Sequence, residues 1–253
     1  MAAPCCWQQS ALPFPPLLMS TPNHLILNVA DGTQMHAYTA FPAHTNLAPG
    51  ILLFQEAFGV NQHIRNVADR LAAAGYVVVA PELFHRTAAP GLEISYNDFP
   101  SAMPHFQGIT PEGLAQDAQA AYDWLQGQNQ VQNDKVGAIG FCLGGRVAFV
   151  ANAALPLQAA VSYYGGGLHA LADRAAELHA PHLFFWGGLD QHIAKEQREQ
   201  IVAAVDAAGK PYINTVISYA DHGFNCDERP SYSPAAATEA WALTLAFLAD
   251  KLK

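Results

Sequence analysis

The sequence predicts an α/β protein with a mostly parallel, eight-stranded sheet that is flanked by helices on both faces. Short runs of β-branched, aromatic and apolar residues alternate along the chain with longer stretches that repeat apolar residues at helical spacing. This alternation is typical of strands joined by crossover helices. The chain has 253 residues and 51% hydrophobic content, which is enough to bury a core that needs neither disulfides nor metal for stability.

Eight runs predict the strands of this sheet. The first two runs alternate apolar and polar residues and are separated by a short segment around Asp31-Gly32, which predicts an antiparallel hairpin. The later runs are apolar, as expected for strands buried on both faces. The runs are HLILNV from His24, QMHAYTAF from Gln34, ILLFQ from Ile51, YVVVA from Tyr76, KVGAIG from Lys135, QAAVSYY from Gln158, HLFFW from His182 and YINTVISY from Tyr212.

Helical periodicity predicts five helices between and after these strands. The first carries its apolar face over residues 64–72 and ends near Gly75, which suits a left-handed C-cap. The second begins with Thr110 as N-cap and Pro111 in its first turn. The others are expected around residues 144–155, 201–205 and 237–252. Residues 81–111 are rich in proline and aromatics and are longer than a simple connection, so we expect a partial lid there.

The composition of the chain indicates a single domain and argues against two classes of binding partner. We expect a single domain over residues 19–253, preceded by a disordered N-terminal tail over residues 1–18. The net charge of -9, with only 12 lysines and arginines, argues against a nucleic-acid or anionic-membrane surface, since both need clustered positive charge. Neither a basic leader nor an apolar run of about 20 residues is evident. These features favour a cytoplasmic protein, monomeric or a small homo-oligomer, that acts on a small molecule.

The positions of the four cysteines bear on whether one of them is a reactive thiol. Cys5 and Cys6 are adjacent and Cys142 and Cys226 are far apart, so they form no disulfide framework. Cys142 lies in GFCLGG, directly after a predicted strand and before a predicted helix. That is the Gly-x-Ser-x-Gly nucleophile elbow with sulfur in place of oxygen, and a helix N-terminus favours a negatively charged sulfur. The alternative is that Cys142 is merely a small buried hydrophobe.

A thiol nucleophile needs a base, and the base needs an orienting acid, which in this architecture follow the nucleophile in the order acid, histidine. Asp190 follows the strand HLFFW, and His222 follows the strand YINTVISY, so both are expected in loops at the same edge of the sheet. His192 is the rival base and Asp221 the rival acid. We expect no metal, because the cysteines and histidines show no paired ligand spacing.

The motifs QEAFGVNQHIR, APELFHR, GFCLGGR, SYYGGG, WGGLDQHI and DHGF, in this order, resemble those of the dienelactone hydrolases, which are also called carboxymethylenebutenolidases. The resemblance covers roughly residues 24–250. It implies the α/β-hydrolase fold, no cofactor, and a catalytic triad of Cys142, His222 and Asp190. It also implies that Glu56 is hydrogen-bonded to the resting thiol and accepts its proton when substrate arrives.

The resemblance further implies an oxyanion hole and a binding site for substrate. The backbone amides of Leu143 and Ala57 would stabilise the charge that develops on the carbonyl oxygen. Arg86 would bind a substrate carboxylate, and Tyr164 would line the pocket, with a core aromatic as the alternative. In the best-known members a second arginine follows the catalytic histidine by four residues, but here Cys226 occupies that position.

These observations predict a hydrolase that opens small lactones such as dienelactone, or cleaves esters, through a cysteine acyl-enzyme. Two alternatives remain open at the level of sequence. One is a broad-specificity carboxylesterase or thioesterase with little need for an anionic substrate, because Cys226 replaces an arginine. The other is a ligand-binding or thiol redox protein that uses Cys142 and Cys226 without turnover. Arg229 is a candidate replacement for the missing arginine.

Overall fold

The computed structural model describes residues 23–43 and 47–253. The expected N-terminal tail over residues 1–18 therefore lies outside the described residues. Eight strands form one sheet in the order β1-β2-β4-β3-β5-β6-β7-β8. The strands are β1 (His24–Asn28), β2 (Gln34–Ala40), β3 (Ala48–Phe54), β4 (Val77–Pro81), β5 (Val131–Phe141), β6 (Ala159–Tyr163), β7 (His182–Gly187) and β8 (Tyr212–Ile217).

The eight predicted strands are all present, and the sheet is mostly parallel, as predicted. β1 and β2 form the expected antiparallel hairpin, and β2 also pairs antiparallel with β4. The remaining pairs are parallel. The expectation of burial on both faces holds for β3, β4, β6 and β7. It is wrong for β8, whose Ile213 and Val216 are exposed because β8 is the last strand of the sheet.

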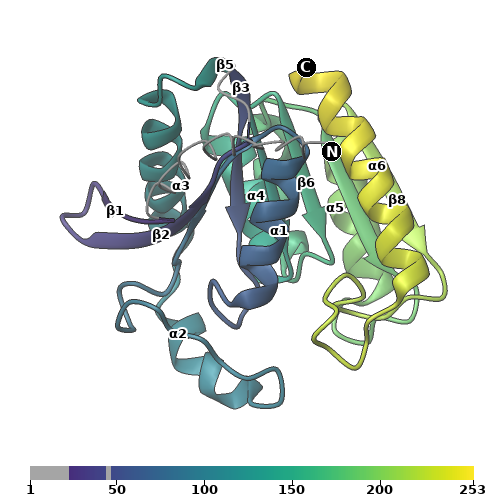
Figure 1. Cartoon of the computed structure of the whole chain (residues 1–253). Helices are drawn as coiled ribbons and strands as arrows, with labels where there is room; N and C mark the ends of the chain where they lie inside the picture. The colour runs from purple at the N-terminus through teal and green to yellow at the C-terminus, as the bar shows by residue number, and fades with distance from the viewer. Residues whose placement is uncertain (1–22, 44–46) are drawn as a thin grey trace, which may run out of the picture.

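The helices cover both faces of the sheet (Figure 1). On one face α1 lies beside α6, and the guanidinium of Arg70 stacks 4.0 Å from the ring of Trp241 between them. On the other face α3 packs against α4, and α5 packs against a 3-10 helix at Leu168–Glu177. The helices are α1 (Gln62–Ala73), α2 (Met103–Gln107), α3 (Pro111–Gln126), α4 (Leu143–Ala154), α5 (Lys195–Ala207) and α6 (Pro234–Leu252).

Local signals in the sequence explain where two of the predicted helices begin and end. The Thr110 side chain accepts a hydrogen bond from the Gly113 amide at 3.0 Å and so caps α3. Gly75 adopts a φ of 93° directly after the end of α1, a conformation that glycine adopts without strain. The short helix α2 was not predicted. It lies within the expected lid segment, which hangs below the sheet in Figure 1.

Apolar side chains from both helical layers and from the sheet form one main core. A smaller cluster of Ala57, Phe58, Ile94 and Ala102 ties the lid segment to the loop after β3. Among the described residues, no helix combines the length and the apolar character needed to cross a membrane.

Candidate active site

Cys142 lies at the sharp turn between β5 and α4. Its backbone has φ 54° and ψ -112°, a left-handed conformation that costs a non-glycine residue energy and that is concentrated at functional sites. The turn is held by the Cys142 amide, which donates to the Tyr163 carbonyl at 3.0 Å, and by the Gly145 amide, which donates to the Cys142 carbonyl at 3.1 Å. The strained residue therefore ends a strand in the middle of the sheet and stays partly accessible.

The glycines around Cys142 are required by close backbone contacts. A Cβ atom on Gly140 would overlap the carbonyl group of Gly144, and one on Gly144 would overlap the carbonyl of Phe54. A Cβ on Gly145 would lie 2.9 Å from the Cα of Gly165. The glycine spacing thus lets α4 begin directly against the ends of β3 and β6.

The structure brings Asp190 and His222 together across the loops after β7 and β8. His222 Nδ1 lies 2.8 Å from Asp190 Oδ2, while Asp190 Oδ1 accepts from the amides of His192 and Ile193 at 2.7 and 3.1 Å. Burial raises the pKa of Asp190, but these hydrogen bonds outweigh burial and hold it below its ordinary value. The carboxylate is therefore fixed and charged, as an orienting acid must be.

The imidazole of His222 lines the same cavity as Cys142. Burial lowers the pKa of His222, but the charge on the Cys142 sulfur and the hydrogen bond to Asp190 outweigh burial and raise it to about 10. The rival base, His192, packs its ring edge-on against the ring of His222, with the centroids 5.1 Å apart. The rival acid, Asp221, accepts from the His222 backbone amide and not from its ring.

The amides of Leu143 and Ala57, which are expected to form the oxyanion hole, lie shortly after two neighbouring strands, β5 and β3. Leu143 is the first residue of α4, so its amide has no acceptor within that helix. Ala57 is fully buried in the turn after β3, the strand that lies next to β5. Neither amide donates a backbone hydrogen bond within the part of the chain that the structure describes.

Glu56 has no exposed surface, and its partner is an arginine that the sequence motifs did not assign. Glu56 Oε1 lies 3.2 Å from Arg229 Nη1, whereas Oε2 has no hydrogen-bond partner among the described residues. The Tyr164 ring is fully buried 5.1 Å from the His222 ring, and its hydroxyl is likewise unpartnered within that part of the chain. Burial and then the charge of Glu56 raise the pKa of Tyr164 well above its usual value.

Arg86 was expected to bind the substrate carboxylate, but it lies outside the cavity at Cys142. Its guanidinium forms two hydrogen bonds with the fully buried Asp117 at 2.8 and 2.9 Å, and a third with Asp31 at 2.7 Å. His85 Nε2 also lies 3.1 Å from Asp117. The buried carboxylate of Asp117 recruits Arg86 as its counter-ion, because an unpaired buried charge is costly. Arg86 is not among the residues that line the cavity at Cys142.

A cavity of about 490 Å³ opens at Cys142 and His222. Four aromatic rings line it, those of Phe58, Tyr96, Phe99 and Phe106, and three of them come from the expected lid segment. Arg229 also lines the cavity, with its guanidinium 5.6 Å from the Phe58 ring and 5.7 Å from the Tyr96 ring. A more open hollow of about 540 Å³ between α5 and β8 contains neither Cys142 nor His222.

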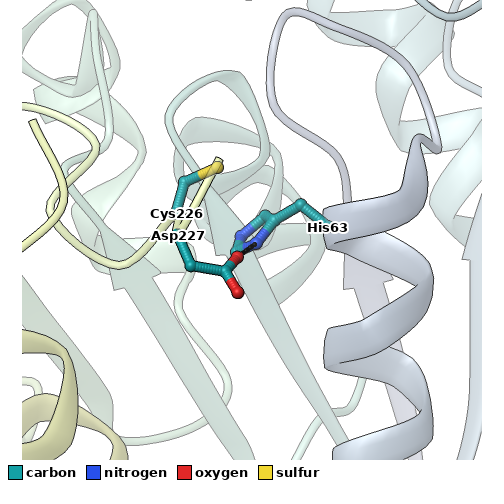
Figure 2. A group of neighbouring side chains, drawn as sticks. All are labelled: His63, Cys226 and Asp227. Carbon is teal, nitrogen blue, oxygen red and sulfur yellow. Dashed lines mark hydrogen bonds and ion pairs between the residues drawn. The ribbon is translucent and has the colours of Figure 1, made fainter. Parts of the chain in front are cut away.

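Three more side chains could in principle hold a metal ion. Figure 2 shows His63 from the first turn of α1 facing Cys226 and Asp227 of the loop after β8, with one potential ligand atom from each within 4.8 Å of the others. His63 Nδ1 lies 3.2 Å from Asp227 Oδ1, and burial raises the pKa of the Cys226 thiol to about 12. The histidine-carboxylate contact joins the loop to α1, and a metal would first have to displace the thiol proton. Sequence spacing could not indicate this group, because α1 and the loop are far apart in the chain.

Fold and site together define an α/β-hydrolase, with Cys142 at a strained turn after a central parallel strand and a hydrogen-bonded histidine and aspartate on later loops. The chain belongs to the dienelactone hydrolase family, whose family model matches residues 35–252. It is 32% identical over 246 residues to the "Putative carboxymethylenebutenolidase" of Synechocystis sp., covering 87% of this chain and 93% of that protein. It is 33% identical over 248 residues to the protein of the same name in Escherichia coli strain K12, covering 92% and 90%.

Solved structures agree with this assignment. The chain resembles the "Putative Dienelactone Hydrolase" of Klebsiella pneumoniae with a TM-score of 0.79 and 30% identity, over 89% of this chain and 98% of that one. It resembles the structure named m3DLH with a TM-score of 0.80 and 26% identity, over 91% and 98%. The predicted family is thus confirmed, and the chain is a hydrolase.

Proposed function

We propose that the protein opens small lactones, or cleaves esters, with Cys142 as nucleophile. The thiolate attacks the carbonyl carbon, the bond to the alcohol or enol oxygen breaks as protonated His222 gives that oxygen a proton, and a thioester to Cys142 remains. The neutral His222 then removes a proton from water as the water attacks the thioester. The carboxylic acid leaves, and the sulfur takes back the thiol proton from Glu56, so that the starting state is restored. In a lactone the released oxygen stays attached to the acyl group, so the product is a hydroxy or keto acid.

The observation that supports this proposal is that Cys142 shares a cavity with a histidine that is paired with a buried acid. Cys142 and His222 both line this cavity, and His222 Nδ1 lies 2.8 Å from the buried Asp190 carboxylate. An Nδ1-H that donates to Asp190 leaves Nε2 available to the sulfur and to water. The amides of Leu143 and Ala57, which are free of backbone acceptors in the described part of the chain, support a role in stabilising the oxyanion.

Glu56 is the proposed acceptor of the thiol proton. Its Oε2 is buried and unpartnered within the described residues, while its other oxygen contacts Arg229. We assign Oε2 to receive the proton when substrate displaces the resting contacts of Cys142. Tyr164, whose hydroxyl is unpartnered in the same part of the chain, is proposed to donate to Glu56 or to bound substrate.

The names of the relatives favour dienelactone, the substrate of a carboxymethylenebutenolidase, as the first compound to test. The cavity favours a second candidate activity, that of a broad-specificity esterase. Four aromatic rings in a volume of about 490 Å³ provide room and apolar surface for an ester that is larger than dienelactone.

The test is hydrolysis of dienelactone and of para-nitrophenyl esters by the wild-type chain and two cysteine variants. Cys142→Ala is expected to lower kcat/KM by at least about 10³-fold, since nucleophile and base act as a unit. Cys226→Ala is the matched control and keeps multiple turnover. Hydrolysis that survives both Cys142→Ala and alkylation of Cys142 would overturn the proposal. Rapid multiple turnover by the wild type would exclude a purely ligand-binding or redox role.

A further inference from the structure

The cavity at Cys142 is lined by an arginine that has no ion-pair partner in the described part of the chain. Arg146 lines this cavity together with Cys142 and His222. Its Nε is buried and has no hydrogen-bond partner, and its guanidinium forms no ion pair, among the described residues. A buried donor without an acceptor is rare in folded proteins and often marks a binding site. Burial lowers the pKa of Arg146, but an arginine side chain remains protonated at neutral pH.

The other two arginines considered for substrate binding already contact carboxylates of the protein. Arg86 lies outside the cavity and is neutralised by Asp117 and Asp31. Arg229 lines the cavity but contacts the buried Glu56 carboxylate and lies near two aromatic rings. Arg146 is therefore the cavity arginine that lacks a counter-ion within the described part of the chain.

The position of Arg146 on α4 sets which part of a substrate it can reach. It follows Leu143 by three residues, and residues with this spacing lie on one face of a helix. Leu143 supplies one of the amides proposed for the oxyanion hole, and both residues line the cavity. A Cβ on Gly167 would lie 3.6 Å from Arg146 Nη1. Gly166 and Gly167 line the same cavity, so the segment after β6 brings no side chain between the guanidinium and a bound substrate.

We propose that Arg146 binds a carboxylate of the substrate, at the position that the sequence motifs had assigned to Arg86. This inference rests on the proposed hydrolase function, and what it adds is the residue that recognises the negative charge of a lactone or ester substrate. The planar guanidinium pairs with a carboxylate through two parallel hydrogen bonds. The aromatic rings accommodate the apolar remainder of the molecule.

The experiment compares mono-para-nitrophenyl adipate with its methyl ester, in which a neutral ester group replaces the distal carboxylate. Arg146→Met is expected to lower kcat/KM for the carboxylate substrate about 10- to 150-fold, as for loss of a charge-assisted hydrogen bond, and that for the methyl ester by less than about 3-fold. Arg146→Lys should keep part of the preference. Arg174→Met removes a cation whose partner is Glu177, outside the cavity, and should leave the ratio of the two rates unchanged.

A binding measurement separates failure of this inference from failure of the hydrolase proposal. Hexanoate is expected to bind the Cys142→Ala chain more tightly than hexanamide, and Arg146→Met in that chain should abolish the difference. If the wild type hydrolyses neither ester but this difference appears, the anion site stands and the hydrolase proposal fails. Equal rate losses on both esters, no loss on either, or equal binding of hexanoate and hexanamide would each overturn the assignment of Arg146.

Discussion

The carboxylate of Glu56 is fully buried, and its Oε1 lies 3.2 Å from Nη1 of Arg229 at the edge of the cavity that contains Cys142. This pair links the loop after β3 to the loop after β8, which are 173 residues apart in the chain. A buried carboxylate that loses its counter-ion is strongly destabilising. The contact is therefore expected to contribute to the stability of the fold.

Arg229→Met is expected to lower the free energy of unfolding by about 2 to 3 kcal/mol, because it leaves the Glu56 charge buried and unpaired. Adding Glu56→Gln should restore part of that loss, since the double variant has no buried charge at this point. Urea denaturation of the two single variants and the double variant measures the coupling. Strictly additive losses would show that the two side chains do not interact.

The glycines of the nucleophile turn should tolerate no side chain. Gly144→Ala is expected to cost at least about 3 kcal/mol of stability, because its Cβ would overlap the carbonyl of Phe54 and only backbone movement could relieve the contact. Gly166→Ala is the matched control, since a Cβ atom on Gly166 would meet nothing within 4 Å and the φ of this residue is not positive. Thermal or urea unfolding of both variants gives the comparison. A Gly144→Ala chain as stable as Gly166→Ala would contradict the described backbone contacts.

The titration of His222 should depend on Cys142. Burial lowers the pKa of His222, but the charge of the sulfur is the foremost of the opposing effects that raise it to about 10. Cys142→Ser removes that charge and is expected to lower the pKa of His222. NMR titration of the imidazole in both proteins, with His222→Gln to assign the signal, measures the change. An identical titration in wild type and Cys142→Ser would show that the two side chains are not coupled.

The same pKa predicts how stability depends on pH. The folded-state pKa of His222, about 10, lies above the ordinary value of 6.5. The contribution of protonated His222 is therefore complete below pH 6.5 and is lost as the pH rises through about 10. The difference in the free energy of unfolding between wild type and His222→Gln should shrink over that interval. A difference that grows with pH would have the wrong sign.

Arg86 is expected to matter for stability and not for substrate choice. Arg86→Met leaves the buried Asp117 with His85 as its one remaining side-chain partner among the described residues and should cost about 2 kcal/mol or more. The ratio of kcat/KM for mono-para-nitrophenyl adipate and its methyl ester should match that of the wild type, measured at a temperature where the variant is folded. A selective loss on the carboxylate substrate would restore Arg86 to the binding site.

Much of the site was predictable because its signals are local. The glycine spacing around Cys142 follows from contacts made within one strand-turn-helix unit, and Asp190 and His222 directly follow strands whose ends must share one edge of a parallel sheet. The aromatic rings of the cavity were less accessible to prediction. Tyr96, Phe99 and Phe106 belong to a segment that was expected to form a lid, but nothing in its order of residues shows which rings face inward.

The α/β architecture and the family could be predicted from the order of residues alone, because strand and helix periodicity and glycine requirements are encoded over a few residues. The proposed order of nucleophile, acid and base was predicted from the same local signals. The pairing of charged groups became evident only in the folded chain. Arg86 pairs with Asp117, Glu56 pairs with Arg229, and Arg146 faces the cavity without a counter-ion among the described residues. A long charged side chain pairs with whichever opposite charge is buried within its reach after folding. This depends on distances between segments that are far apart along the chain.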